Sequence, residues 1–451
     1  MNSSTPVVRR ALLRRAVLLL LLLLAAPSLP AAEGETTLLR LQGSNTVNAD
    51  LGPRLVAGLL TAQGYRDLSL QPTDVMDEWR LVARAADGRA VAVQIAAHGT
   101  GTGFTALANQ TTDVAAASRP INDNEAKALA PLGDLRSKDA EYVIGLDGLA
   151  IIVHPGNPLR QLDLQQLAQI FAGDITDWQQ LGGTPGPIRL YARDDRSGTY
   201  DTFRELVLTP AGKRLSQTAK RYESNEELAQ QVASDPAGVG FTSLAAAAKL
   251  PMLALRDGEG QAIVPSEASV ATEDYPLARR LFLYAPPDHR SDWANRLLEF
   301  SQTAAGQALV QQSGFVAQRI VPLKITATAG LPPAYAELAR RAQRLTVNFR
   351  FTAGSAQLDN KALRDVERLA AFMRQPENAN RRLLVVGFND ATEDPARAAL
   401  LGRLRATAVA TALRHQQAFP SEVLSLGDKL PVAGLSENGR VKNRRVEAWI
   451  D

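Results

Sequence analysis

The sequence predicts an α/β protein with mostly parallel sheets, followed by a second and smaller α/β domain. Strand-like apolar segments alternate with helix-like amphipathic segments from Leu38 to about Leu323, which is typical of α/β layers. A stretch with glycine and prolines over 326–343 then interrupts regular structure. With 451 residues, the chain is long enough for two or three domains that each bury a core.

Residues 1–32 differ from the rest of the chain and predict a secretory signal peptide. Four arginines precede the apolar run AVLLLLLLLLAA, and small residues follow it. A basic start, a short apolar centre and a small-residue end are the three parts of such a signal. An uncleaved membrane anchor is the alternative, and the pattern leaves Sec or twin-arginine export open.

The composition excludes several kinds of site. The chain has no cysteine, which excludes disulfides, thiolate metal sites and a lipid-modified cysteine, so we do not expect a lipoprotein. Without the four arginines of the signal, the 50 basic residues become 46 against 47 acidic ones, so nothing indicates nucleic-acid binding.

The two halves of the chain differ in charge. Residues 344–451 hold 17 basic and 12 acidic residues, and the mature part before them holds 29 basic and 35 acidic residues. This asymmetry predicts different partners for the two halves.

Hydrophobic patterning places the individual elements. In the first region it predicts strands, with helices between them, over 38–42, 91–97, 149–155, 188–192, 239–244 and 281–286. In the second region it predicts a helix after Asp359, a helix over 395–414, and strands over 345–351, 383–388 and 444–450. The predicted organisation is a signal peptide (1–32), a first α/β domain (33–325), a linker (326–343) and a C-terminal domain (344–451).

Three junctions rich in glycine and hydroxyl residues predict a site for a small anion. Ser197-Gly198-Thr199 opens an amphipathic helix, and Arg193 precedes it by four residues. Helix starts offer unpaired N–H groups, glycine lets a ligand approach the backbone, and a guanidinium adds positive charge. The segments 43–46 and 99–103 follow two other strands, and Ser118 with Arg119 follows a third. Helix capping explains one such junction, whereas three together favour an oxyanion site.

Five separated motifs carry a family resemblance. In order, the segments GSNTV, GTGTGFTALANQTTDVAAASRPI, LAIIVHPGNPL, IFAGDITDW and ARDDRSGTYDTF resemble the periplasmic phosphate-binding proteins of ABC transporters and their wider substrate-binding relatives. The resemblance covers roughly 38–323 and implies a two-lobed, hinged, type II-like binding protein that crosses between lobes near 149–155 and 281–286. By motif, it implies anion contacts from Ser44, Asn45, Thr46, Thr102, Gly103, Ser118, Arg193, Ser197, Gly198 and Thr199.

Two departures from this family bear on the ligand. Family members often have serine in the second glycine loop, where this chain has Thr100 and Thr102, so a hydroxyl is kept. Phosphate binders place an aspartate after the serine of the third loop, where this chain has Arg119. That carboxylate accepts the proton of hydrogen phosphate and repels sulfate, so its loss weakens selectivity. Phosphate is expected, and a related oxyanion stays open.

The end of the chain resembles the OmpA-like peptidoglycan-associated domain. The matching segments are FRFTAGSAQLD, GFND, LGRLRATAV and GRVKNRRVEAWI, and they extend over essentially all of 345–451. The resemblance implies that Asp390 and Arg405 hold the ammonium and carboxylate of diaminopimelate in the peptidoglycan stem. Three departures are expected to loosen this site, namely Phe388-Asn389 for His-Thr, Ala398 for asparagine and Gly402 for serine. Further support is expected from Asn443, Arg444 and Arg445.

Together these patterns predict an exported periplasmic protein that captures phosphate or a similar oxyanion and binds peptidoglycan toward the outer-membrane side. No catalysis, cofactor or metal is expected, and an ABC permease is an open partner. The alternative is a wall-bound structural or adhesive protein whose first domain has lost its ligand. A hydrolase using Ser197 is disfavoured, because DRSGT lacks the nucleophile elbow and the histidines lack triad or metal spacing (His98, His154, His289 and His415).

Overall fold

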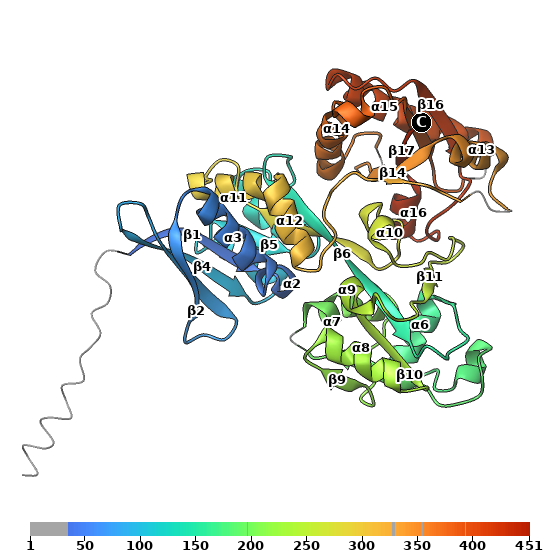
Figure 1. The fold of residues 1–451 in the computed structure, drawn as a ribbon, viewed down its shortest axis with the longest axis horizontal. Helices are drawn as coiled ribbons and strands as arrows, with labels where there is room; N and C mark the ends of the chain where they lie inside the picture. The colour runs from blue at the N-terminus through green and yellow to red at the C-terminus, as the bar shows by residue number, and fades with distance from the viewer. Residues whose placement is uncertain (1–34, 196, 327–329, 353–354, 393) are drawn as a thin grey trace, which may run out of the picture.

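The computed structural model describes residues 35–195, 197–326, 330–352, 355–392 and 394–451, and the predicted signal peptide lies outside them. Figure 1 shows three bodies: a first lobe mostly in blue and cyan, a second lobe in green, and a C-terminal body in orange and red. One long strand runs from the first lobe into the second. Within the described ranges, no helix has the length and apolarity needed to cross a membrane.

The first lobe is a sheet with a core on each face. On β5, Val114 and Ala116 face the core under α3, whereas Ala115 and Ala117 face the core under α4. This alternation follows from the period of two in a strand. The elements are β1 (Thr36–Gly43), α2 (Asn45–Asn48), α3 (Leu51–Ala62), β2 (Arg66–Pro72), β3 (Glu78–Arg84), β4 (Ala90–Ala97), α4 (Thr100–Ala108), β5 (Val114–Ala117), α5 (Asp123–Leu129), η1 (Ala130–Leu132), α11 (Asp292–Gln302) and α12 (Ala304–Gln312).

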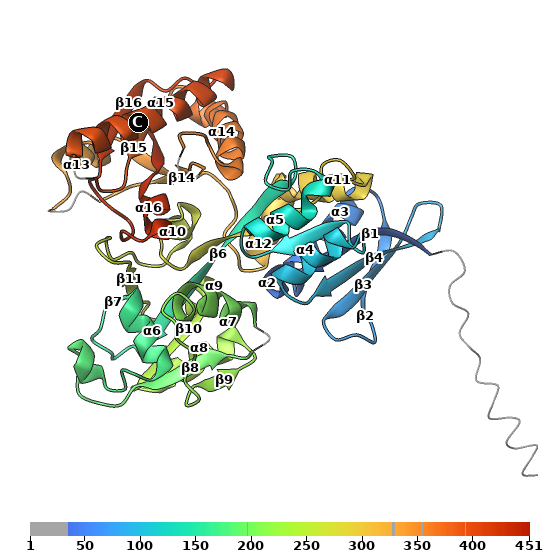
Figure 2. The same ribbon diagram turned by 180° about the vertical axis from the view of Figure 1, so that it is seen from behind.

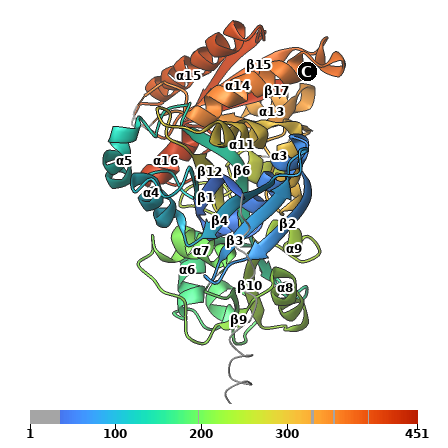
Figure 3. The ribbon, with the colours of Figure 1, turned by 90° about the vertical axis from the view of Figure 1, so that its left-hand side faces the viewer.

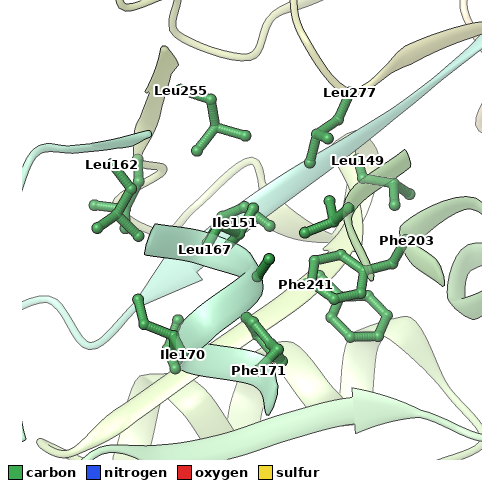
Figure 4. Close-up of a cluster of buried hydrophobic side chains, with 14 of the residues drawn as sticks. Leu149, Ile151, Leu162, Leu167, Ile170, Phe171, Phe203, Phe241, Leu255 and Leu277 are labelled. Carbon is green, nitrogen blue, oxygen red and sulfur yellow. The ribbon is translucent and has the colours of Figure 1, made fainter. Parts of the chain in front are cut away.

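The second lobe has an aromatic core, in which Phe171, Phe203 and Phe241 pack against one another (Figure 4). Its helix α6 begins at a capping box on Asp163 and ends at Gly173, which has φ 85° and terminates the helix in the left-handed region. The elements are β7 (Gln161–Asp163), α6 (Leu164–Ala172), η2 (Trp178–Leu181), β8 (Arg189–Arg193), α7 (Gly198–Phe203), η3 (Arg204–Leu208), β9 (Lys220–Tyr222), α8 (Asn225–Ser234), β10 (Gly238–Ser243), α9 (Leu244–Ala247), β11 (Ala254–Arg256) and α10 (Glu267–Ala271).

Two strands join the lobes, β6 (Glu141–Val153) and β12 (Ala278–Tyr284). They complete a ten-stranded sheet in the order β2-β3-β4-β1-β5-β12-β6-β10-β8-β9. β6 pairs antiparallel with β12 in its first half and with β10 in its second half. The predicted strands 149–155 and 281–286 therefore overlap the second parts of the two crossing strands and extend two residues past the end of each. Both crossing strands begin earlier than predicted, because charged residues in their first halves hide the apolar pattern.

The C-terminal body is a five-stranded sheet in the order β13-β14-β17-β15-β16. Asp359 caps its first long helix as predicted, since the carboxylate accepts the Ala362 N–H at 2.7 Å. The predictions omitted β16, whose alternation is weak because its side chains are mostly half-buried. The elements are β13 (Pro322–Leu323), α13 (Pro333–Arg341), β14 (Gln343–Phe349), α14 (Asn360–Met373), η4 (Pro376–Asn378), β15 (Leu383–Phe388), α15 (Pro395–His415), β16 (Glu422–Gly427), α16 (Glu437–Asn443) and β17 (Val446–Ile450).

Helix α13 lies inside the stretch predicted as a linker, and it packs on the C-terminal sheet. Tyr335 and Leu338 of α13 are buried against Phe388 and Trp449. The Tyr335 hydroxyl also donates to the Glu447 carboxylate at 3.2 Å. The second half of this stretch is therefore part of the C-terminal core.

Candidate functional site

The predicted anion loops of the first lobe meet at one edge of its sheet. β1 lies between β4 and β5 and runs parallel to both, so the carboxyl ends of the three strands lie together. The Ser44 N–H donates to the Ala116 carbonyl, and the Gly99 N–H donates to the Gly43 carbonyl, both at 2.9 Å. Asn45 begins α2 at the same edge. The structure therefore brings these three loops together.

The hydroxyl groups at this edge have definite partners. The Thr100 hydroxyl lies 3.2 Å from the Ser118 hydroxyl and accepts the Ser118 N–H at 3.1 Å. The Thr102 hydroxyl instead donates to a carbonyl within its own turn at 2.8 Å. A Cβ on Gly103 would lie 2.7 Å from the Gln42 carbonyl oxygen, so close packing on β1 explains this glycine. Of the two threonines in the second glycine loop, Thr100 is therefore the one that contacts Ser118.

The predicted junction of the second lobe touches the first lobe directly. Ser197 caps α7, where its hydroxyl accepts the Tyr200 N–H at 3.4 Å, and Thr199 lies in the first turn. A Cβ on Gly198 would lie 2.7 Å from the Thr46 Cα, an approach that only glycine permits. The Thr46 hydroxyl is 3.5 Å from the Gly198 carbonyl oxygen. Two predicted site residues 152 positions apart are thus neighbours across the lobes.

The two arginines that the sequence suggested for this site bind elsewhere. Arg193 donates to the Tyr222 carbonyl at 3.1 Å and to the Glu223 carbonyl at 2.6 Å, and burial lowers its pKa. Arg119 donates to both oxygens of Glu125 at 2.8 Å, and this hydrogen bonding raises its pKa. Among the described contacts, neither guanidinium reaches the junction between the lobes. This arrangement differs from the expectation that Arg193 lies beside the anion loops.

Arg279 on β12 supplies the guanidinium at the junction, and the sequence analysis missed it. Its Nη2 is 2.9 Å from the Thr46 hydroxyl oxygen and 3.3 Å from the Gly198 carbonyl oxygen. Its Nε donates to Asp147 at 3.1 Å, and its Nη1 donates to Glu205 at 3.0 Å. Only 7% of Arg279 is exposed, so the carboxylates balance a buried charge. We call these five residues the latch.

The sequence indicated that the latch residues Asp147 and Arg279 are unusual, but it did not indicate that they pair with each other. Asp147 interrupts an apolar run in β6, and Arg279 stands in an apolar strand as well. Buried charges need partners, so such residues mark a hidden ion pair. The partner follows from the strand register, which places Arg279 directly opposite Asp147. Thr202 completes the group by donating to Asp147 at 2.9 Å.

The second predicted site lies at the end of β15 in the C-terminal body. Asp390 and Arg405 are both largely buried. Arg405 donates from Nη1 to the side-chain oxygen of Asn389, which precedes Asp390 in the chain. The Asp390 carboxylate lies 3.3 Å from Arg440 and 3.8 Å from Arg444. The structure therefore brings the predicted acid and the predicted base to one place.

Arg405 keeps one donor without a partner. Its Nε is buried and makes no hydrogen bond with any described residue. Burial lowers the pKa of Arg405, and Arg444 lowers it further, while Asp390 opposes both. A buried unpaired donor costs about 1–3 kcal/mol, which a bound acceptor would recover. This arrangement can bind a molecule that carries both a carboxylate and an ammonium group.

Glycine at position 402 permits close packing beneath this site. A Cβ on Gly387 would lie 1.9 Å from the Gly402 carbonyl oxygen. A Cβ on Gly402 would lie 2.7 Å from the Ser425 hydroxyl oxygen. Together the two glycines let α15 pack directly on β15. Ala398 is also fully buried on this helix, so a larger polar residue there would need space.

The three expected supporting residues have different roles. Arg444 contacts Asp390, as described above. Asn443 accepts two backbone N–H groups, from Val432 and Ala433, at 2.8 and 3.1 Å and so shapes the loop before α16. Arg445 is buried over the Phe388 ring at 3.9 Å and pairs with Glu447 at 3.0 Å, which places it in the core instead of solvent.

Comparisons with known proteins cover both halves of the chain. The family model described as PBP superfamily domain matches residues 71–304, and the OmpA family model matches 350–445. Protein SphX of Synechococcus elongatus is 32% identical over 274 residues, which are 58% of this chain and 75% of that protein. Phosphate-binding protein PstS of Pseudomonas aeruginosa is 28% identical over 243 residues, or 50% and 74%. The solved peptidoglycan-associated lipoprotein of Burkholderia pseudomallei is 25% identical, with a TM-score of 0.22, over 23% of this chain and 89% of its own.

Proposed function

This chain belongs to the PBP superfamily and ends in an OmpA family domain, and we propose that it is an exported protein that captures phosphate between its lobes while bound to peptidoglycan. The observation that carries the first part is the contact of Thr46 with Gly198, which brings two predicted anion loops together from opposite lobes. In the proposal, residues 1–32 direct export to the periplasm, and the C-terminal domain holds the protein at the wall.

Backbone amides and hydroxyl groups are the proposed phosphate ligands. The first N–H groups of α2, α4 and α7 have no acceptor within their own helices, and they stand at the three junctions. The hydroxyl groups of Thr100 and Ser118 lie beside them. Because Arg279 is already balanced by Asp147 and Glu205, its charge supports the loops more than it attracts the anion.

The latch supports this proposal by orienting one peptide unit. The Gly198 carbonyl accepts a hydrogen bond from Arg279 at 3.3 Å and lies 2.8 Å from the Thr202 hydroxyl, which shares its one hydrogen between this carbonyl and Asp147. A trans peptide unit is planar, so its N–H points opposite to its C=O. Holding this carbonyl therefore aims the Thr199 N–H away from the latch. Closure of the lobes around an anion would use such contacts, because they form between the lobes.

Diaminopimelate in the peptidoglycan stem is the proposed ligand of the C-terminal site. Its carboxylate would accept from the free Nε of Arg405, and its ammonium would pair with Asp390. Both protein groups are largely buried, so each interaction would be stronger than a surface ion pair. No catalytic step is needed for either ligand.

Titration of the full mature chain tests the proposal. We expect calorimetry to detect phosphate binding, with sulfate and arsenate titrated beside it to rank the oxyanions. In parallel, we expect the protein to sediment with purified sacculi and to be released by free diaminopimelate. Absence of heat with every oxyanion would reject the first half of the proposal, and unbound protein in the supernatant would reject the second half.

A second function is favoured by one observation, namely that Arg193 and Arg119 are both engaged elsewhere. The protein would then be a wall-bound structural or adhesive protein whose lobes have lost the anion. Thermal unfolding separates the two functions. A ligand at 100 times its dissociation constant stabilises a protein by about 2.7 kcal/mol, so phosphate should raise the Tm only if it binds. A transport role would in addition require docking to an ABC permease.

A further inference from the structure

The C-terminal body contacts the first lobe through α14. Arg364 donates to the Glu141 carbonyl at 2.9 Å, and its guanidinium lies 3.8 Å from the centre of the Tyr142 ring. Lys138 of the first lobe forms an ion pair with Glu367 at 2.6 Å. Glu141 and Tyr142 open β6, so these contacts reach the start of a strand that crosses between the lobes. Figure 2 shows α14 above this end of β6.

The same body contacts the second lobe through the loop 431–435. The Gln261 N–H donates to the Pro431 carbonyl at 3.1 Å. A Cβ on Gly260 would lie 2.8 Å from the Ala433 nitrogen, so the two backbones touch here. In Figure 3 the C-terminal body lies above both lobes, as these contacts require. It therefore bridges the lobes, and a change in their relative position must disturb one set of contacts.

The C-terminal body also contacts residues 274–276, which lead into β12. Asp274 is buried and pairs with Arg344 at 2.6 Å and with Arg350 at 3.3 Å. Lys442 of α16 donates to two carbonyls of this segment, Tyr275 at 3.2 Å and Pro276 at 3.1 Å. Separating such buried groups leaves uncompensated charges, so the segment is held firmly. We call the three sets of contacts the clamp.

Arg440 links the clamp to the candidate C-terminal site at Asp390 and Arg405. This residue contacts Asp390 at 3.3 Å and also donates from Nε to the Leu435 carbonyl at 3.0 Å. Leu435 belongs to the loop that touches the second lobe. A ligand ammonium at Asp390 would compete with Arg440 for the carboxylate. Release of Arg440 would then loosen the loop and weaken the clamp on the second lobe.

We propose that peptidoglycan binding and phosphate binding oppose each other through the clamp, an inference that rests on the proposed function. In this structure the clamp is formed and the lobes touch at Thr46 and Gly198. Loosening the clamp lowers the population of this arrangement, and the apparent phosphate affinity falls with that population. The coupling is reciprocal, so phosphate must weaken wall binding by the same factor.

Paired titrations of the full mature chain test the coupling. Phosphate is titrated with and without a saturating diaminopimelate stem tripeptide, and the tripeptide is titrated with and without phosphate. We expect the Kd of each ligand to rise about fivefold or more when the other is present, because coupled sites typically differ by about 5–150-fold. Unchanged or lower Kd values would overturn the coupling. If either ligand fails to bind alone, the proposed function itself fails, and the coupling with it.

Two variants on α14 separate the clamp from a general effect of mutation. Arg364→Ala removes the hydrogen bond to the Glu141 carbonyl and the contact with the Tyr142 ring, and should bring the coupling factor toward one. Arg374→Ala, at the residue that follows α14, serves as control, because Arg374 donates to the Gln416 carbonyl within its own domain at 3.1 Å. We expect it to keep the wild-type factor. Equal factors in both variants would overturn the assignment of the coupling to the clamp.

Discussion

The buried arginines of the two candidate sites differ in how many of their nitrogens have hydrogen-bond partners. Arg279 in the latch has a hydrogen-bond partner for each of its three nitrogens. Arg405 in the C-terminal site uses Nη1 but has a buried Nε with no described partner. The first arginine therefore organises protein groups, whereas the second keeps one donor without a described partner. Loss of Arg279 should chiefly affect the fold and closure of the lobes, and loss of Arg405 should chiefly affect binding.

The largest expected effect follows from removal of the latch arginine. Arg279→Met leaves Asp147 as a buried carboxylate without its ion pair, which should lower the free energy of unfolding by about 3–5 kcal/mol. Urea denaturation measures this loss. The double variant Arg279→Met with Asp147→Leu removes both charges and should recover most of the stability. If the double variant is as unstable as the single one, the ion pair does not explain the effect.

The next largest effect is expected at the C-terminal site. Arg405→Met should weaken binding to sacculi by about 2–5 kcal/mol, which corresponds to at least about 30-fold, because it removes one partner of a buried charge interaction. Co-sedimentation with sacculi measures it. Phosphate binding should persist, and Arg403→Met, at an exposed position on the same helix, should retain full wall binding. Normal sedimentation of the Arg405 variant would reject its assignment as a ligand.

A smaller effect is expected where the lobes meet. Gly198→Ala places a Cβ about where Thr46 lies, and such overpacking costs about 1–3 kcal/mol. The phosphate Kd from calorimetry should therefore rise by roughly 5–150-fold, since closure in the proposed function uses this approach. Gly101→Ala is the matched control in another anion loop, because nothing lies within 4 Å of its Cβ position. Similar Kd values for the two variants would show that the Thr46–Gly198 contact does not matter for binding.

The smallest expected effect concerns the clamp. Its contribution to the stability of the fold should be lower in acid than at neutral pH. Burial alone would raise the pKa values of Asp274 in the clamp and of its neighbour Glu273, which pairs with Lys361 of α14 at 3.4 Å, but their cationic partners lower both below the ordinary 3.8 and 4.5. Groups with lowered pKa values stabilise the fold above their ordinary pKa and lose this contribution as the pH falls. We expect the Tm to fall as the pH drops below about 4.5. Asp274→Asn should flatten this dependence, and an unchanged slope would contradict it.

Comparison of the sequence predictions with the structure shows which signals were local. Asp390 and Arg405 were predicted from the family resemblance, and they lie just after β15 and on α15. The glycine loops were found because turn chemistry is written in a few adjacent residues. Arg193 was expected at the anion loops on its spacing to Ser197, yet strand β8 directs it toward β9 instead. Spacing along the chain could not show this direction.

By itself, the sequence determined the order of two α/β domains and the glycine loops at strand ends, and its family resemblance singled out Asp390 and Arg405 as a predicted acid and base. Only the tertiary structure decided that Arg279 pairs with Asp147, 132 positions away, and that Thr46 meets Gly198. It also decided that the C-terminal body lies against both lobes. The physical reason is range: periodicity and turn chemistry act within a few residues, whereas ion pairs between distant strands depend on register and burial.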